Sequence, residues 1–380
     1  MDYQLSEEHL LFQETVREFV EREIAPRAAE IDATDRFPRD IFERMAELGL
    51  LGIPFEEKYG GAGGDYLSLL IALEEIARAS GTVAIILDAH TSLCCEPIHL
   101  FGSEEQKKRY LLPLATGAKL GAFGLTEPGA GSDAGAIRTR AVRDGDGWVL
   151  NGEKTFITNG SLADVLVVTA KTDPEKGTHG ISTFIVEKDT PGFHVGRDEK
   201  KMGLKGSVTS QLSFEDCRVP AENLLGKENE GFRQLMVTLD AGRLAISAMA
   251  VGLAQGALDK AAAYAKERVQ FHQPIARFEA IQWMIADMAT EIEAARLMIH
   301  RAAWLKGQGR RFTKEAAMAK LFSTEVSERA CYKAIQIHGG YGYMQEYAVE
   351  RMYRDQRLCA IGEGTNEIQR LVIARHVLGA

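Results

Sequence analysis

The feature that most constrains this 380-residue chain is its hydrophobic period, which changes twice. Residues 1–120 carry apolar side chains at helical spacing. Near Gly121 the pattern changes to short segments rich in β-branched and aromatic residues, separated by turn signals such as 144–147 and 191–192. Helical spacing returns near Gly231 and continues to the end. This order predicts a mostly α-helical chain with a central β domain.

The changes of period predict three domains. They are an N-terminal helical domain (1–120), a middle antiparallel β domain of sandwich or barrel-like form (121–230), and a C-terminal four-helix bundle (231–380). Strands do not alternate with helices, so a Rossmann fold is disfavoured. The strongest helical signal has apolar residues at intervals of four and three, as in a bundle seam: Ile281, Ile285, Met288, Ile292, Ala295, Ile299 and Ala302.

Apolar spacing and turn residues also give the expected elements. Helices are predicted over 41–51, 67–79, 83–100, 232–268, 314–337 and 366–378. Strands are predicted over 148–151, 154–158, 164–171, 181–187 and 211–215, with Asn151-Gly152 as a turn.

Composition excludes some classes of function. The net charge of −9, from 45 basic and 54 acidic side chains, argues against general nucleic-acid binding. The five cysteines are odd in number and form no CxxC pair, so we expect no metal site, no disulfide framework and a reducing compartment. No signal peptide or spanning helix is expected. A cytoplasmic protein is the default, and a mitochondrial matrix protein that had lost its targeting peptide would look the same.

Two glycine-rich or strand segments could face a ligand. Backbone N–H groups of the run 125–133 could approach an anion or a planar ring, but a plain strand-to-turn connection fits equally well. The run lacks the lysine of a phosphate-binding P-loop. In the segment 154–160, Phe156 and Thr158 share one face of a strand. A hairpin edge with one buried aromatic is the simpler interpretation of that segment.

Two helix ends carry chemistry-bearing residues. Arg268 could bind a phosphate, or it could lie at a helix end because of the helix dipole. In the run 336–342 a helix is expected to stop at a glycine pair with a left-handed cap, and His338 has no second metal ligand near it in sequence.

The last segment of interest is 361–370. Asn366 and Gln369 resemble a capping box, which places a helix start at Asn366. Glu363 precedes it, between Gly362 and Gly364, so a ligand could approach its carboxylate closely. A solvated loop glutamate is the alternative.

In this order the segments resemble the acyl-CoA dehydrogenase family over nearly the whole chain, in its short- and medium-chain-like branch. The shared runs are Thr-Glu-Pro-Gly-Ala-Gly-Ser-Asp at 126–133, Gly-Glu-Lys-x-x-Ile-Thr-Asn at 152–159, Gln-Ile-His-Gly-Gly at 336–340 and Glu-Gly-Thr at 363–365. The resemblance implies FAD between the β domain and the bundle, in a homotetramer built as a dimer of dimers.

The resemblance also assigns cofactor contacts. Residues implied to line or bind FAD within the subunit are Phe123, Leu125, Thr126, Gly131, Ser132, Phe156, Ile157, Thr158, Thr365, Asn366 and Glu367. Residues implied to reach the FAD of a neighbouring subunit are Arg268, Phe271, Gln336, Ile337, His338, Gly339 and Gly340.

The implied substrate is an acyl-CoA, contacted by Ser132, Asp240, Arg243 and Gly364. The resemblance implies that Glu363 removes the α proton while the β hydride passes to flavin N5, which yields the trans-2-enoyl-CoA. The Glu363 N–H and a ribityl hydroxyl would polarise the thioester oxygen. Electrons would pass to an electron-transfer flavoprotein, as in fatty-acid β-oxidation.

One choice within the family can be read from the sequence. Some members carry the base on a helix, in a Leu-Asp-x-Glu-Arg context, whereas this chain has Gly242 there and keeps Glu363. The chain departs from the family in three places: Phe156 replaces a frequent Trp, Gly362 a frequent Tyr, and Glu279 a common Gln. The alternatives are an acyl-CoA oxidase, which is usually longer, and a scaffold that has lost FAD.

Overall fold

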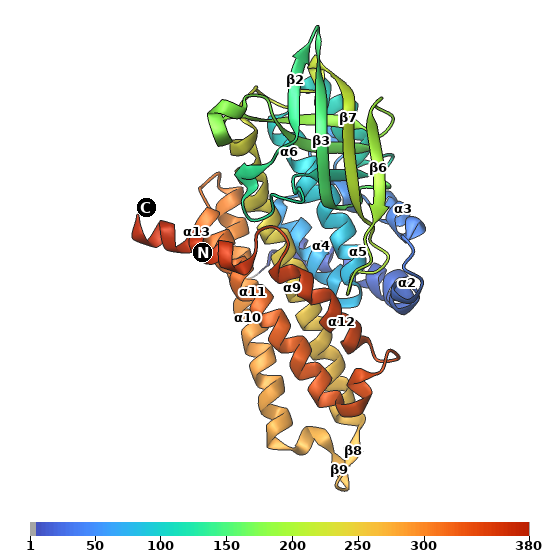
Figure 1. Cartoon of the computed structure of the whole chain (residues 1–380). Helices are drawn as coiled ribbons and strands as arrows, with labels where there is room; N and C mark the ends of the chain where they lie inside the picture. The colour runs from blue at the N-terminus through green and yellow to red at the C-terminus, as the bar shows by residue number, and fades with distance from the viewer. Residues whose placement is uncertain (1–4, 380) are drawn as a thin grey trace.

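The computed structural model, which describes residues 5–379, confirms a mostly helical chain with a sheet in its middle (Figure 1). The N-terminal part contains α1 (Glu7–Phe19), α2 (Ala28–Thr34), α3 (Arg39–Glu47), α4 (Tyr66–Ala79), α5 (Gly81–Asp88), α6 (Glu96–Phe101), α7 (Glu104–Gln106) and α8 (Leu112–Ala115). The C-terminal part contains α9 (Gly231–Glu267), α10 (Glu279–Gly307), α11 (Thr313–His338), α12 (Ala348–Gln356) and α13 (Asn366–Leu378).

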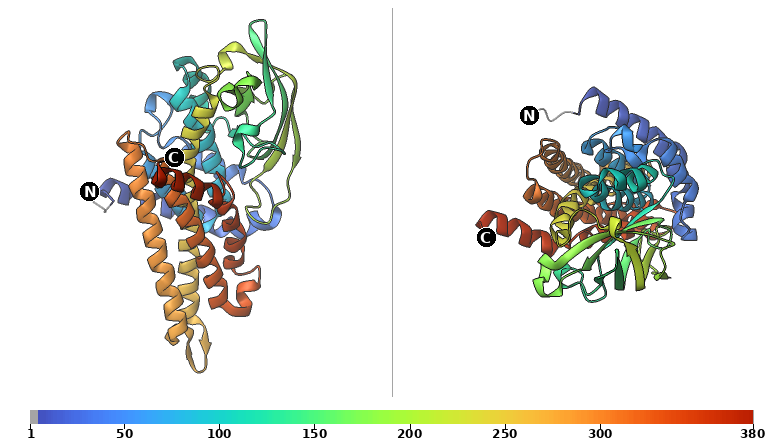
Figure 2. Two further views of the ribbon diagram at one scale, coloured as in Figure 1. Left: turned by 60° about the vertical axis from the view of Figure 1, so that its left-hand side comes forward. Right: turned by 90° about the horizontal axis from the view of Figure 1, so that it is seen from above.

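The bundle consists of the long helices α9, α10 and α11 together with the shorter α12 (Figure 2). Its predicted seam is confirmed, because the side chains of Met288, Ile292, Ala295, Ile299 and Ala302 are buried along α10. Helix α4 of the N-terminal part also packs on α9. The N-terminal helices and the bundle therefore share one continuous apolar core.

The predicted helix over 83–100 is interrupted. It consists of α5, a π-helical turn η5 (Ala89–Cys95) and α6. At the junction, Ser92 donates its hydroxyl hydrogen to the backbone oxygen of Asp88 over 2.7 Å. Such π-helical turns are frequent at functional sites, and this one faces α9.

The middle part is a seven-stranded sheet. Its strands are β1 (Gly121–Gly124), β2 (Arg140–Asp144), β3 (Gly147–Thr158), β4 (Val165–Lys171), β5 (Ile181–Glu187), β6 (Phe193–Asp198) and β7 (Thr209–Pro220). They follow the order β1-β4-β2-β3-β7-β6, with β5 beside β4. The prediction of a purely antiparallel sheet is wrong for two pairs, since β4 runs parallel to both β1 and β2. Long connections between these strands permit that arrangement.

Strand β3 corrects the predicted turn at Asn151-Gly152. The chain continues through these residues, and a register shift against β7 occurs between Leu150 and Gly152. Gly152 has φ 148°, and a Cβ on it would lie 2.6 Å from the Cα of Thr139. The glycine therefore serves a close approach within the sheet, and the two predicted strands are one bulged strand.

Helix α9 alone, among the helices of residues 5–379, is long and apolar enough to cross a membrane. However, 78% of its apolar window is buried inside the protein. Its composition is therefore explained by its place in the core, where α4, α10 and α11 surround it.

Close packing of α9 on α4 gives a test of the shared core. A Cβ on Gly252 would lie 2.2 Å from the backbone oxygen of Glu74. We expect Gly252→Ala to destabilise the protein by about 1–3 kcal/mol, since the two helices must separate. Thermal unfolding measures the change. Gly307→Ala is the control, because nothing lies within 4 Å of a Cβ there, and equal effects of the two substitutions would contradict the packing argument.

Candidate active site

Glu363 lies on the loop between a short 3-10 turn, η12 (Arg357–Ala360), and α13. Its φ of 54° is in the left-handed region, which is strained for a residue with a side chain. Gln369 of α13 donates to the backbone oxygens of Glu363 and Gly364 over 3.3 and 2.9 Å. These bonds hold the loop in its strained form.

The start of α13 corrects the predicted capping box. Thr365 is the N-cap, and its hydroxyl accepts from a backbone N–H of the first turn. The side-chain oxygen of Asn366 instead accepts from Lys320 and Thr324 of α11, each at 3.0 Å. Asn366 and Gln369 are thus used in contacts outside the cap, which local spacing does not reveal.

The carboxyl group of Glu363 occupies a place where α9 leaves room only for a glycine. A Cβ on Gly242 would lie 2.1 Å from Oε2 of Glu363 and 2.9 Å from the side chain of Leu93. Both carboxylate oxygens are buried and have no hydrogen-bond partner within the described chain. The loop position and the helix position compared in the sequence therefore converge on one point in space. At Gly362, by contrast, a Cβ would make only ordinary contacts, 3.7 Å away or more.

The surroundings of Glu363 favour its protonated form. Burial raises the pKa of this carboxyl well above its usual range, and the neighbouring Asp88 carboxyl raises it further. Lys320 and Arg243 act in the opposite direction and with smaller effect. A carboxyl with a raised pKa suits proton transfer near neutral pH.

Asp240 and Arg243 form an ion pair on α9 beside this carboxyl. Arg243 Nη1 donates to Asp240 Oδ1 over 2.6 Å, and Thr313 donates to the other oxygen over 2.5 Å. Arg243 is only 5% exposed, and its Nε lacks a partner among the described residues. The charge of Glu363 acts on Arg243, so the structure brings these predicted residues together.

The next group of predicted residues lies on an exposed surface of the β domain, here called the shelf. It comprises Phe123, Leu125, Thr126, Gly131, Ser132, Phe156 and Thr158. The Thr155 N–H donates to the Thr126 oxygen over 2.8 Å and joins the two segments. Phe156 is 65% exposed, with φ 59°, while its neighbour Ile157 is buried. The buried-aromatic interpretation of Phe156 is therefore wrong, and a strained, exposed aromatic indicates a surface for a ligand.

The other predicted residues of these segments complete the shelf. Phe123, Leu125, Thr126 and Thr158 are half-buried, whereas Gly131 and Ser132 are exposed on the neighbouring turn. A Cβ on Gly131 would meet nothing within 4 Å. An open surface with an aromatic side chain fits a planar flavin ring.

A buried ion pair fixes the shelf from below. Lys154 Nζ donates to Glu127 Oε1 over 2.7 Å and to the Leu125 oxygen over 3.0 Å. The Glu127 carboxylate also accepts from the backbone N–H groups of Arg138 and Thr139. Burial lowers the pKa of Lys154 to about 8, although Glu127 opposes this shift. The pair therefore ties the 125–133 segment to β3.

A third group lies at the other end of the bundle. Arg268 caps α9, and Phe271, 84% exposed, lies on the short hairpin β8 (Val269–Gln270) and β9 (Gln273–Pro274), opposite the sheet (Figure 1). Glu279 is exposed nearby, at the first residue of α10. These residues therefore lie far from the shelf of the same chain (Figure 1).

The 336–340 run ends α11. His338 is buried and stacks on Tyr264 at 4.3 Å between ring centroids, so its ring serves packing. Gly339 has φ 61° but ψ −137°, which lies outside the left-handed helical region, so the predicted left-handed cap is wrong. The chain instead turns into a 3-10 helix, η11 (Gly339–Tyr343).

Two residues near Glu363, Asp88 and Lys320, were not predicted from the sequence as part of the site. Both are fully buried. Each has a signal in the sequence, since Asp88 is an acid after the apolar run 83–87 and Lys320 follows alanines on a helix. Their proximity to Glu363 depends on long-range packing.

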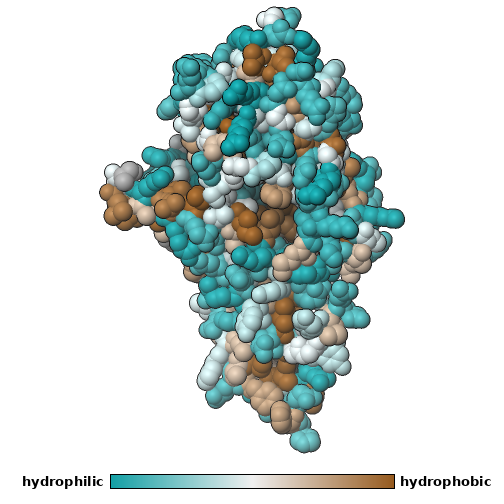
Figure 3. All heavy atoms as spheres, in the orientation of Figure 1, coloured by the Kyte–Doolittle hydropathy of each residue, from teal (hydrophilic) through white to brown (hydrophobic). Residues whose placement is uncertain are grey.

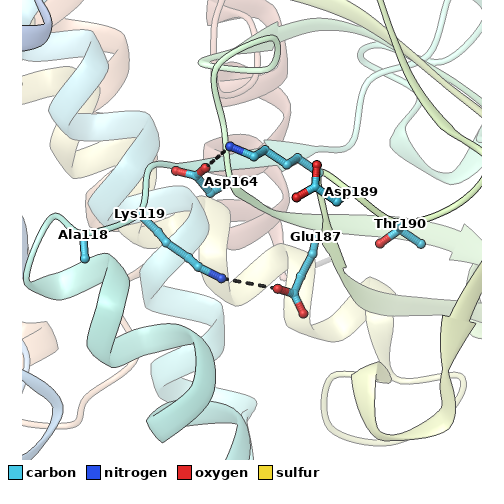
Figure 4. A pocket seen from close by; sticks show the side chains of 7 residues that line it. Ala118, Lys119, Asp164, Glu187, Asp189 and Thr190 are labelled. Atoms are coloured by element: carbon cyan, nitrogen blue, oxygen red, sulfur yellow. Dashed lines mark hydrogen bonds and ion pairs between the residues drawn. The ribbon is translucent and has the colours of Figure 1, made fainter.

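A hollow on the β domain is lined by paired charges and offers no comparable site (Figure 4). Lys119 pairs with Glu187 at 3.3 Å, and Lys188 with Asp164 at 2.6 Å. These charges are satisfied by one another, so the hollow offers no unpaired charge to a ligand.

Models of the three domains of acyl-CoA dehydrogenases match the chain in order. The N-terminal domain matches residues 6–118, the middle domain 122–217 and the C-terminal domain 229–378. The chain belongs to the acyl-CoA dehydrogenase family. It is therefore a flavoprotein oxidoreductase of this family.

Individual relatives agree in length. The short-chain specific acyl-CoA dehydrogenase of Clostridium acetobutylicum is 52% identical over 98% of this chain and 99% of its own. The acryloyl-CoA reductase (NADH) of Anaerotignum propionicum is 49% identical over 100% and 96%.

Solved structures agree in fold. A chain from work on the electron transferring flavoprotein of Acidaminococcus fermentans has a TM-score of 0.99, 49% identity and full coverage of both chains. Butyryl-CoA dehydrogenase of Megasphaera elsdenii has a TM-score of 0.98, 46% identity and full coverage of both. The prolyl acyl carrier protein oxidase AnaB has a TM-score of 0.95 and 34% identity, over 98% of this chain and 100% of its own.

The buried pair beneath the shelf gives a prediction. Lys154→Met would leave Glu127 buried without its cation, so we expect a loss of about 3–5 kcal/mol in the free energy of unfolding at pH 7. Chemical denaturation measures it. Lys188→Met is the matched control, since its pair with Asp164 is exposed and should cost less than about 1 kcal/mol. Equal losses would refute the role given to the buried pair.

Proposed function

We propose that the protein is an FAD-dependent enzyme that converts a short acyl-CoA to its trans-2-enoyl-CoA, with Glu363 as the base. One observation carries this proposal: the carboxyl of Glu363, buried and without a hydrogen-bond partner among residues 5–379, lies against Gly242, where any side chain would displace it. The family membership and the relatives named acyl-CoA dehydrogenases support the reaction class.

The chain's own residues would perform the proton chemistry. Glu363 accepts the α proton, and its backbone N–H donates to the thioester oxygen, on which negative charge develops. Burial helps because it raises the pKa of the carboxyl, so the carboxylate is a stronger base toward a weak carbon acid. FAD, when bound, supplies the acceptor for the β hydride.

Binding would use the surfaces on either side of Glu363. The exposed Phe156 and the open turn at Gly131 fit a flavin, and Thr365 to Glu367 would border its adenosine-diphosphate portion. Ser132, Asp240, Arg243 and Gly364 would contact the acyl-CoA. The Nε–H of Arg243, which lacks a partner within the described chain, is available for such a contact.

We propose a homotetramer in which neighbouring subunits complete the FAD sites. Arg268, Phe271 and 336–340 lie at the far end of the bundle, so they could serve only another subunit's cofactor. Helix α13 projects from the body, with Leu371, Val377 and Leu378 exposed (Figure 3). Exposed apolar surface of this kind is typical of an interface.

An electron-transfer flavoprotein is the proposed electron acceptor, by analogy with the relative studied alongside that partner. Chain length does not exclude an oxidase, contrary to the expectation from sequence, because AnaB is covered completely by this chain. The acryloyl-CoA reductase similarity raises the reverse reaction as a second candidate. Slow reoxidation of the reduced flavin in air would exclude the oxidase. Bacterial relatives favour a cytoplasmic location.

Substitution of the proposed base is the first test. Glu363→Gln should retain FAD but lose bleaching of the flavin by acyl-CoA by roughly 10²–10⁴-fold, because the amide cannot accept the α proton. Stopped-flow absorbance measures the rate. Glu30→Gln, on the exposed face of α2, should bleach like the unaltered protein. Bleaching of Glu363→Gln near the unaltered rate would remove Glu363 as the base.

The acyl group is tested by a panel of thioesters from C4 to C16, including branched chains. We expect the highest kcat/KM for butyryl-CoA and a value at least roughly tenfold lower for C8, since a pocket built for a short chain rejects added methylenes. A maximum at C8 or longer, or for a branched chain, would show that the short-chain assignment is wrong while leaving the base assignment intact.

A further inference from the structure

A second acid lies beside the proposed base. Asp88, the last residue of α5, is 0% exposed and follows an apolar run, 83–87. Its Oδ1 accepts a hydrogen bond from the hydroxyl of Ser92. Its Oδ2 is buried without a hydrogen-bond partner in the part of the chain that the structure describes. An ionised carboxylate in such a place is costly unless a partner satisfies it.

Glu363 lies beside the π-helical turn that follows Asp88. A Cβ on Gly242 would meet both Glu363 Oε2, at 2.1 Å, and Leu93 of η5, at 2.9 Å. Asp88 raises the pKa of Glu363, whereas Glu363 lowers the pKa of Asp88. Both oxygens of Glu363 are also buried and unpartnered among residues 5–379. Three carboxyl oxygens of the two acids are thus buried and unsatisfied within the described chain. If a proton is placed between them, one acid becomes a donor and the other an acceptor.

The surrounding cations do not satisfy the two acids. Arg243 on α9 donates to an aspartate of its own helix, and Lys320 on α11 donates to the amide of Asn366. Burial lowers the pKa of Lys320 to about 8, so its charge is itself weakly held.

Two neutral groups complete the surroundings. The hydroxyl of Tyr66 on α4 donates to the backbone of α9 over 2.9 Å, and the buried thiol of Cys359 lies on η12. Burial raises the pKa of both groups, and the two acids contribute to the rise. Both therefore stay neutral near pH 7, and neither supplies positive charge.

We propose that Asp88 is a positioning residue that shares one proton with Glu363. Two neighbouring acids cannot both ionise in a buried space, so they titrate as a pair. The shared proton favours Glu363 at rest. In the reactive form it has moved to Asp88, which donates it in a hydrogen bond to one oxygen of Glu363. The other oxygen of Glu363 then accepts the α proton from the substrate. After turnover one proton returns to solvent, and the pair is restored.

The role in catalysis rests on the proposed function, whereas the shared proton does not. Removing the acid with Asp88→Asn leaves Glu363 without a like charge, so ionisation of Glu363 becomes easier. Ser92→Ala acts in the same direction but more weakly. The hydrogen bond from Ser92 lowers the pKa of Asp88, so without it Asp88 stays neutral over a wider pH range and opposes the ionisation of Glu363 less. We expect the acid limb of flavin reduction by butyryl-CoA to move down by about one pH unit in Asp88→Asn and by a smaller amount in Ser92→Ala.

Protein stability tests the pair without reference to catalysis. The folded-state pKa values of both acids are raised, that of Asp88 to about 6. Their protonation therefore stabilises the folded protein at low pH, and this contribution is lost as pH rises through these values. The FAD-loaded protein is compared with Asp88→Asn, Glu363→Gln and the double variant by thermal unfolding from pH 4.5 to pH 8.5.

The expected result is a pH-dependent coupling between the two positions. Near pH 4.5 the single substitutions should add. At pH 8 each should raise the unfolding temperature, and their sum should exceed the double variant, because each removes the same repulsion. Additive effects at every pH, or an unchanged acid limb in both Asp88→Asn and Ser92→Ala, would overturn the shared proton. Bleaching by Glu363→Gln with the coupling intact would instead overturn only the proposed function.

Discussion

The contact on which the site depends joins Gly242 of α9 to the carboxyl of Glu363, where even a Cβ would lie 2.1 Å from Oε2. That contact depends on two rigid supports. Helix α9 is fixed in the shared core by α4, α10 and α11, and the loop of Glu363 is held by Gln369 from α13. The strained φ of Glu363 persists because both supports act on it.

The buried charged groups of this protein fall into two kinds, those with hydrogen-bond partners and those without such partners among the described residues. Lys154 and Glu127 satisfy one another beneath the shelf and have backbone partners besides. Glu363 and Asp88 are buried as well, but most of their oxygens are unpartnered within the described residues. A satisfied pair holds a surface in place, whereas an unsatisfied acid is reactive. The contrast separates the scaffold of the site from its chemistry.

The spacing of apolar residues and the turn residues predicted those helices and strands whose formation depends mainly on nearby residues. The seam of α10 and the range of α13 follow from apolar spacing, and both are confirmed. Longer-range packing decided the rest. Gly152 looked like a turn residue but serves a close approach to Thr139, and Asn366 looked like a cap but binds Lys320. The parallel pairing of β4 could not be predicted either, because the positions of strands along the sequence do not show which strands run in the same direction.

The site also explains why one acid was missed. The π-helical turn η5 follows Asp88 directly and packs on α9, where its Leu93 lies beside Glu363. No spacing between residues 88 and 363 could show this proximity. An acid closing an apolar helix is nevertheless a local anomaly, because burial there costs free energy that packing does not return. Such an anomaly indicates a function more often than a surface acid does. The proposed proton pair thus begins from a buried acid that closes an apolar helix of the N-terminal part.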